Sequence, residues 1–82
     1  MAAWRFLTLP KKQGREIKKK FGTYARGWGS LPVSVVIGTT AWNTSIFPDK
    51  KSGSYLLPLK AKIRKTENIS DHSTVSFVLT LR

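Results

Sequence analysis

Residues Arg26–Lys65 read RGWGSLPVSVVIGTTAWNTSIFPDKKSGSYLLPLKAKIRK, and this stretch decides the fold. It contains a β-branched run at Pro32–Ile37, a segment that alternates between two faces at Ala41–Phe47, and a third apolar run at Ser54–Pro58. The intervening residues are rich in Gly, Pro, Asp and Ser, which is the composition of turns. The stretch therefore predicts three consecutive strands, of which the first two form a hairpin.

The segments on either side predict two further strands and two short helices. The strands are Ala3–Leu9 and Ser73–Arg82, and the helices are Lys11–Phe21 and Leu59–Thr66. In both helices two apolar residues stand four apart while lysine and arginine fill other positions, which is typical of a helix that packs along one edge. Gly14 lies inside the first helix, where glycine lowers helix stability.

Together these elements predict a mostly β domain, a small barrel or pseudo-barrel of about five strands with short helical caps. The 82 residues form one domain, 1–82, and a chain of this length buries only about 60% of its unfolded surface. The chain has no cysteine, so disulfides and thiolate metal sites are excluded. We expect a homodimer, because self-association would enlarge a marginal core.

No segment has the roughly 18 apolar residues that a membrane span needs, and Met1–Pro10 lacks the apolar run of a signal peptide. We therefore expect a cytoplasmic protein that does not insert into a membrane.

The charge of the chain is strongly unbalanced. Fifteen Lys and Arg residues stand against four acids, which gives a formal net charge of +11. Such an excess attracts polyanions: nucleic acid, an anionic membrane surface or an acidic protein partner. Residues 1–32 hold eight basic residues and one acid, residues 33–47 hold no charge, and residues 48–65 hold six basic residues and one acid. The sequence therefore predicts two basic patches.

The candidate polyanion-binding residues come from these patches. They are Lys11, Lys12, Arg15, Lys18, Lys19, Arg26, Lys60, Lys62, Arg64 and Lys65. A surface that serves only solubility normally mixes both signs, and for this reason the first patch points to phosphate contacts; a merely soluble basic surface is the alternative interpretation. If about five of these groups contact phosphates of duplex DNA, the logarithm of the binding constant should fall against that of salt with a slope of about −4 to −5.

The loop Arg26–Ser30 combines an arginine and Trp28 with two glycines. Trp28 is the residue predicted to stack on a base, and each such stack contributes about 1–3 kcal/mol. We favour a structural interpretation, in which the glycines let the chain bend and Trp28 closes one end of the barrel, because the loop lacks the strand-to-helix setting of a phosphate-binding loop. The remaining large aromatic residues, expected in the core or a dimer interface, are Trp4, Trp42, Phe47 and Tyr55.

The sequence contains few side chains that could act in catalysis. His72 is the single imidazole and falls in a predicted surface turn, and the acids are scattered along the chain as Glu16, Asp49, Glu67 and Asp71. General acid–base chemistry needs such groups within hydrogen-bond reach of one another and of substrate. We therefore expect no enzymatic activity, no catalytic residues, no cofactor and no metal site.

Five motifs in this order resemble one known family. The motifs are Arg26–Val33, Ile37–Gly38, Trp42–Pro48, Tyr55–Lys60 and Ile63–Lys65, followed by the alternating last strand. The pattern covers essentially the whole chain and is similar to the bacterial domain-of-unknown-function family nineteen-oh-five. The resemblance implies a double-split β-barrel, distantly AbrB-like, and relatives that often carry a YdeI/OmpD-associated bacteriocin-protection domain.

The chain departs from that pattern at one turn. Where the family usually has Gly-Asp before the last strand, this sequence has Asp71-His72-Ser73. Glycine adopts positive φ cheaply, so the turn must use Asp71 in that conformation or take another shape.

Three hypotheses of function follow. The first is a non-catalytic binding module that holds nucleic acid, largely without sequence specificity, on its basic helical segments. The alternative is a structural or protein-interaction module that docks an acidic partner. The third is a small-ligand site in a cavity of the barrel.

Overall fold

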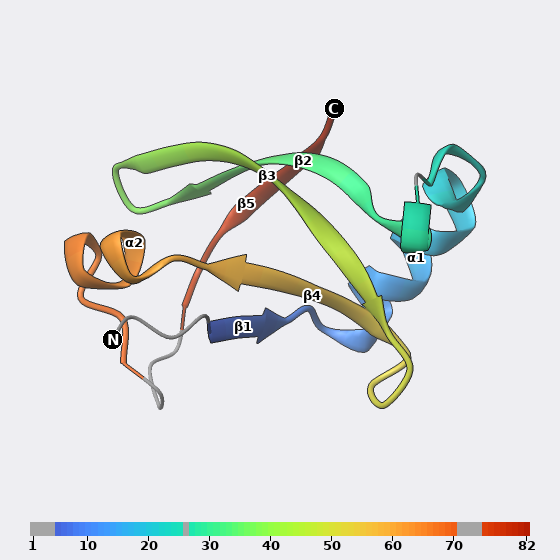
Figure 1. The fold of residues 1–82 in the computed structure, drawn as a ribbon, viewed down its shortest axis with the longest axis horizontal. Coiled ribbons are helices and arrows are strands. Elements are labelled where there is room, and N and C mark those ends of the chain that lie inside the picture. The colour runs from blue at the N-terminus through green and yellow to red at the C-terminus, as the bar shows by residue number, and fades with distance from the viewer. Residues whose placement is uncertain (1–4, 26, 71–74) are drawn as a thin grey trace.

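A computed structural model of the chain describes residues 5–25, 27–70 and 75–82, without the side chain of Trp28. Its strands are β1 (Arg5–Thr8), β2 (Leu31–Ile37), β3 (Thr40–Asp49), β4 (Ser54–Leu59) and β5 (Val78–Leu81), and its helices are α1 (Lys11–Phe21) and α2 (Ala61–Thr66). Two short 3₁₀ helices, η1 (Gly22–Tyr24) and η2 (Gly27–Gly29), lie between α1 and β2. The prediction of a mostly β domain with five strands and two short helices is confirmed (Figure 1).

The five strands form one antiparallel sheet in the order β1-β4-β3-β2-β5. The long strand β3 changes partner along its length, because Thr40–Ile46 pairs with β2 whereas Phe47–Asp49 pairs with β4. The sheet therefore bends into two halves that face each other across the core (Figure 1). The described strands β1 and β5 are the two edges of the sheet, so the predicted barrel is not strictly closed and pseudo-barrel is the accurate description.

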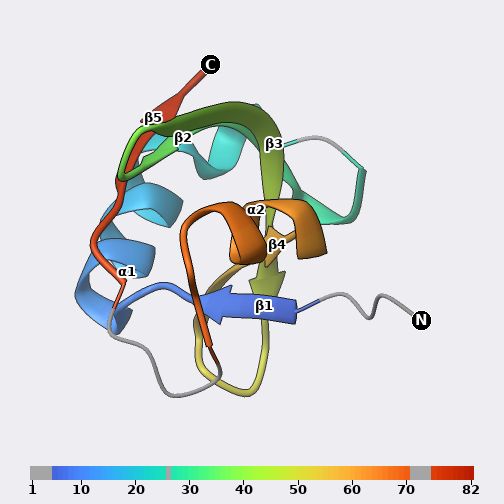
Figure 2. The same cartoon turned by 90° about the vertical axis from the view of Figure 1, so that its left-hand side faces the viewer.

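The core lies between the two halves of the sheet. Alternate residues of β2 point into it, and Val33 and Val35 are fully buried there together with Ile46 of β3 and Leu57 of β4. Helix α1 closes one end of the molecule with buried Ile17, and α2 closes the other with buried Ile63 (Figure 1). Figure 2 shows α2 lying across its end, between β1 and the β2–β3 hairpin.

Several element boundaries differ from the sequence prediction, and helix α2 begins at Ala61 because Leu59 is the last residue of β4. Strand β3 continues through Pro48–Asp49, which had the composition of a turn, because both residues pair with the first residues of β4. Strand β5 covers only Val78–Leu81, because it pairs with Val33–Val36 of β2. The connector after α1 contains the two 3₁₀ helices, which the sequence did not predict. Trp4 and the turn Asp71-His72-Ser73 lie outside the described residues.

Gly14 holds α1 directly against the start of β4. A Cβ at this position would lie 2.9 Å from the Cα of Ser54, closer than real contacts of this kind. The Ser54 hydroxyl also donates to the carbonyl of Pro10, immediately before the helix, at 3.4 Å. The glycine that weakens the helix by propensity therefore lets it approach the sheet, and this contact places α1 beside the β3–β4 turn.

Within the described ranges, no helix is long and apolar enough to cross a membrane.

Candidate functional site

The basic residues of α1 all lie on its exposed side. Ile17 faces the core and Phe21 packs against it, as the spacing predicted, and Gly14 is buried as well. The exposed residues are Lys11, Lys12, Arg15, Glu16, Lys18, Lys19 and Lys20. Three of the lysines stand in the last turn of the helix, where positive charge is favourable because backbone carbonyls there carry partial negative charge. The helix therefore presents six cations and one acid to solvent.

A second group of cations stands on the turn between β3 and β4. The Asp49 carbonyl accepts a hydrogen bond from the Gly53 N–H at 2.9 Å, and its Oδ2 accepts one from the Ser52 N–H at 3.2 Å. Gly53 supplies the positive φ of 71° that the turn requires. These bonds fix a compact turn with Lys50 and Lys51 at its exposed tip.

The carboxylate of Asp49 is held in its charged form by the same turn. Hydrogen bonding from Ser52 lowers the pKa of Asp49 most, opposed by partial desolvation, with smaller contributions from the backbone N–H groups and from the charge of Lys51. Its oxygen is thus engaged by the turn itself and offsets only part of the local positive charge.

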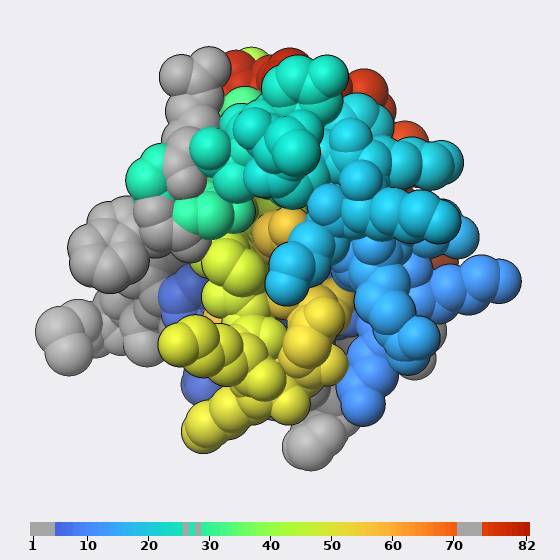
Figure 3. All heavy atoms as spheres, turned by 90° about the vertical axis from the view of Figure 1, so that its right-hand side faces the viewer, coloured from blue at the N-terminus to red at the C-terminus, as the bar shows by residue number. Residues whose placement is uncertain are grey.

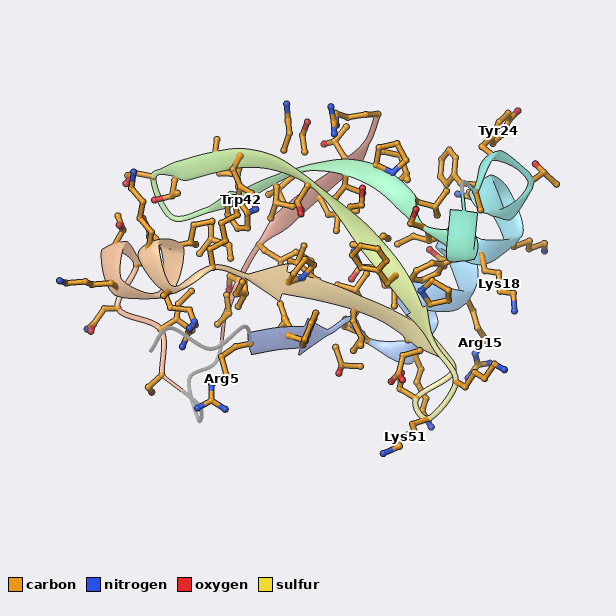
Figure 4. The ribbon with its side chains drawn as sticks, viewed as in Figure 1. Arg5, Arg15, Lys18, Tyr24, Trp42 and Lys51 are labelled. Carbon is orange, nitrogen blue, oxygen red and sulfur yellow. The ribbon has the colours of Figure 1, made fainter. Side chains whose placement is uncertain are left out.

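The helix and the turn meet in one surface. Lys18 of α1 and Lys50 of the turn line a single hollow of about 270 Å³, over Pro48 and Tyr55. In Figure 4, Arg15 and Lys18 project from α1 on the same flank of the molecule as Lys51, and Figure 3 shows the turn in yellow beside α1 in blue on one face. We call Arg15, Lys18, Lys50 and Lys51 the helix–turn surface.

The sequence prediction missed half of this surface. Lys50 and Lys51 belong to the second basic patch, but their segment has the composition of a turn and gave no reason to expect binding residues there. The one signal available was the pair of adjacent lysines at the turn's centre. Their proximity to α1 depends on the contact between Gly14 and Ser54, which no local pattern in the sequence encodes.

The basic residues of α2 lie far from this surface. Lys60, Lys62 and Lys65 are exposed, whereas Arg64 is half-buried and lines a hollow with Leu7 and Leu59. Helix α2 stands at the opposite end of the long axis from α1, and the molecule measures 34 Å along that axis (Figure 1). The structure therefore brings only Lys50 and Lys51 of the second predicted patch to α1 and leaves the basic residues of α2 apart (Figure 1).

The aromatic residues divide into two groups. Tyr55 is buried and Trp42 packs against the core, as expected, whereas Phe47 is 40% exposed. Phe6 and Tyr24, which the sequence did not single out, are also exposed. Arg26 and Trp4 lie outside the described residues, and the Trp28 side chain is not described, so base stacking by Trp28 stays a prediction.

The acids of the described region do not gather. Glu16 is exposed on α1, Asp49 belongs to the turn, and Glu67 accepts a hydrogen bond from the Thr40 hydroxyl next to the β2–β3 turn. Among residues 5–25, 27–70 and 75–82, no three His, Cys, Asp or Glu side chains form a group that could hold a metal ion. His72 and Asp71 lie outside those ranges.

Comparison with protein-family models matches residues 1–79 to the family described as "Domain of unknown function (DUF1905)". No curated protein and no solved structure matches the chain.

Proposed function

The chain belongs to the DUF1905 family, as its motifs indicated, and we propose that it is a non-catalytic module that binds nucleic acid through the helix–turn surface. The family match carries no function, so the proposal rests on the physical chemistry of this surface. Contact is with the phosphate backbone and is largely independent of base sequence, because flexible lysine side chains provide charge more than base-edge recognition.

One observation carries the proposal: Lys18 and Lys50, from separate elements, line the same hollow. Asp49 lines the hollow as well, and Arg15 and Lys51 project on the same flank of the molecule as Lys18 (Figure 4). Like charges repel, so a fold that places them together raises its own free energy unless a counter-anion binds. The phosphates of a nucleic acid are a repeating anion that can contact all four cations at once.

The exposed face of α1 extends this surface. Lys11 lies about 20° from Lys18 around the helix axis, at roughly 100° per residue, and continues the surface. Lys19, Lys12 and Glu16 are about 100°, 120° and 160° from Lys18. The acid therefore lies on the side of α1 away from the hollow. A nucleic-acid backbone that runs from the hollow along α1 therefore meets Lys11.

The lysines at α2 are not among the primary contacts that we propose. The molecule is 34 Å long, which is close to one turn of B-form DNA, about 34–36 Å. A duplex bound at the helix–turn surface reaches Lys60, Lys62 and Lys65 only if it runs along the whole molecule. We therefore assign the primary contacts to the helix–turn surface.

A matched pair of triple variants tests the assignment. Changing Lys18, Lys50 and Lys51 to Gln removes the same charge as changing Lys60, Lys62 and Lys65 to Gln. With a fluorescein-labelled duplex and anisotropy at low salt, we expect the first variant to lose at least about tenfold in affinity and the second to lose much less. Equal losses would show that only net charge matters, and no binding of either a duplex or a single strand by the wild type at low salt would overturn the proposal.

The alternative, an acidic protein partner, would use the same cations. The ratio of absorbance at 260 nm to that at 280 nm for untagged protein separates the two hypotheses, because co-purified nucleic acid raises this ratio and co-purified acidic protein does not.

The third hypothesis, a small-ligand site, needs a cavity inside the sheet. Val33, Ile46 and Leu57 are packed together and fully buried there.

The proposal places the module in the cytoplasm and takes a homodimer as its working state. The homodimer is supported by the small size of the chain and by Val36 and Val78, which pair across β2 and β5 and are both exposed. Light scattering of protein washed at high salt gives the mass of the free particle, and a monomer at micromolar concentration would contradict the dimer.

A further inference from the structure

Two exposed aromatic rings share a groove on the outer face of the sheet. Phe6 of β1 is 54% exposed and Phe47 of β3 is 40% exposed, and β4 lies between these strands. Both rings line one groove of about 530 Å³, together with Pro58 of β4, which pairs with Phe6. Thr44, Ser45 and Arg82 complete the described lining.

The alternation of the strands places these rings outside the core. Ile46 is fully buried, so its neighbour Phe47 points to the other face of β3. Phe6 likewise precedes Leu7, which packs against the core. Large aromatic rings contribute most to stability when they are buried. Two exposed rings in one open groove therefore indicate a binding surface.

The groove and the hollow of the helix–turn surface follow each other along β3, since Phe47 lines the first and Pro48 the second. Phe47 precedes Lys50 by three residues, and an extended strand advances about 3.3 Å per residue, so the two Cα atoms are separated by about 10 Å at most. Arg82 adds a cation to the groove itself, and none of the described lining residues is acidic. The rings are thus flanked by positive charge, which matches an anionic ligand that also carries flat apolar groups.

We infer that this groove holds unpaired bases of a single-stranded nucleic acid, stacked on Phe6 and Phe47, while the phosphates run toward Arg82 and the helix–turn surface. This inference rests on the proposed function and narrows its ligand from nucleic acid in general to a single-stranded nucleic acid. Stacking needs a ring face and a free base, and the bases of a duplex are covered by their neighbours. The hydroxyls of Thr44 and Ser45 stand in the lining as hydrogen-bond partners for base edges.

The test compares three fluorescein-labelled probes of about 12 residues by anisotropy: oligothymidylate, an abasic strand with the same number of phosphates, and a duplex. We expect the wild type to bind oligothymidylate about tenfold or more tightly than the abasic strand. Phe47→Ala and Phe6→Ala should each lower the affinity for oligothymidylate about fivefold or more and leave the affinity for the abasic strand unchanged.

Two controls separate stacking from folding. Phe47→Leu keeps an apolar side chain and removes the aromatic face, so it should behave as Phe47→Ala does. Tyr24→Ala removes an exposed aromatic ring that does not line the groove and should alter the binding of neither probe.

The outcomes also separate this inference from the proposed function. Equal affinity of the wild type for oligothymidylate and the abasic strand would overturn stacking, leave the polyanion surface standing, and point to an apolar protein segment as the occupant. Equal weakening of both probes by Phe47→Leu would overturn stacking as well. No binding of any probe at low salt would overturn both.

Discussion

Gly14 of α1 packs directly on Ser54 of β4, so closely that a Cβ at position 14 would lie 2.9 Å from the Ser54 Cα. Gly14→Ala should therefore destabilise the fold by about 1–3 kcal/mol, because the helix must move away from the sheet. This loss opposes the gain of up to about 1 kcal/mol that alanine brings to a helix interior. Thermal unfolding followed by circular dichroism measures the net effect, about 4–8 °C for each kcal/mol in a domain of this size.

Gly22 offers the matched control for this substitution. It has φ −58° and a hypothetical Cβ 3.6 Å from the Lys18 side chain, which is an ordinary contact. Gly22→Ala should leave stability unchanged or raise it by about 0.4–1 kcal/mol. A Gly14→Ala protein as stable as Gly22→Ala would refute the packing argument.

The bounds of α1 were predicted correctly, whereas the role of Gly14, which lets the helix approach β4, was not predicted. Helix limits follow from local signals, here Ile17 and Phe21 four residues apart and Gly22 after them. The need for Gly14 comes from Ser54, forty residues away, and a contact of that kind leaves no local pattern. The same contact explains why Lys50 and Lys51 were not grouped with α1.

The salt dependence of binding should report how many phosphates the protein neutralises. With about five phosphates neutralised, the slope of log K against log salt on duplex DNA is expected to be −4 to −5, and each phosphate fewer makes it shallower by about 0.9. Lys51→Gln should therefore reduce the slope by about one unit, and Lys65→Gln should not. Anisotropy titrations at four or more salt concentrations measure both, and an identical slope for Lys51→Gln and wild type would remove Lys51 from the interface.

The hairpin of β2 and β3 was predicted, whereas the other strand pairings were not and the exposure of the strand residues was predictable only in part. Alternation alone separates Ile46 from Phe47 and places them on opposite faces of β3. It does not say which face is covered, because that depends on how the sheet bends where β3 changes partner from β2 to β4. The groove between Phe6 and Phe47 arises from this long-range arrangement and for that reason was not predicted from the sequence.

The Asp49 carboxylate should make the fold sensitive to acid. Hydrogen bonding from Ser52 lowers the pKa of Asp49 in the folded protein below its ordinary value of 3.8. A folded pKa below the unfolded one means that the ionised carboxylate stabilises the fold above pH 3.8 and that this contribution disappears as pH falls through the folded pKa. The wild type should thus be more stable than Asp49→Asn at neutral pH.

Thermal unfolding of both proteins at neutral pH and at about pH 2.5 checks this sign. We expect the difference between the two midpoints to shrink toward zero in acid. A difference that is the same at both pH values would mean that the charge of Asp49 plays no part in holding the turn.

Glu67 should couple the end of α2 to the β2–β3 hairpin. Its carboxylate accepts a hydrogen bond from the Thr40 hydroxyl and lies against Gly38, whose φ is 58°. Thr40→Val and Glu67→Met keep the size of each side chain and remove the bond, so the two changes should be less than additive, with a coupling of about 0.5–1.5 kcal/mol. Urea unfolding of the wild type, both single variants and the double variant gives this coupling. Strict additivity would mean that the hairpin and α2 are held together by apolar packing alone, since Trp42 and Ile69 pack against the same core.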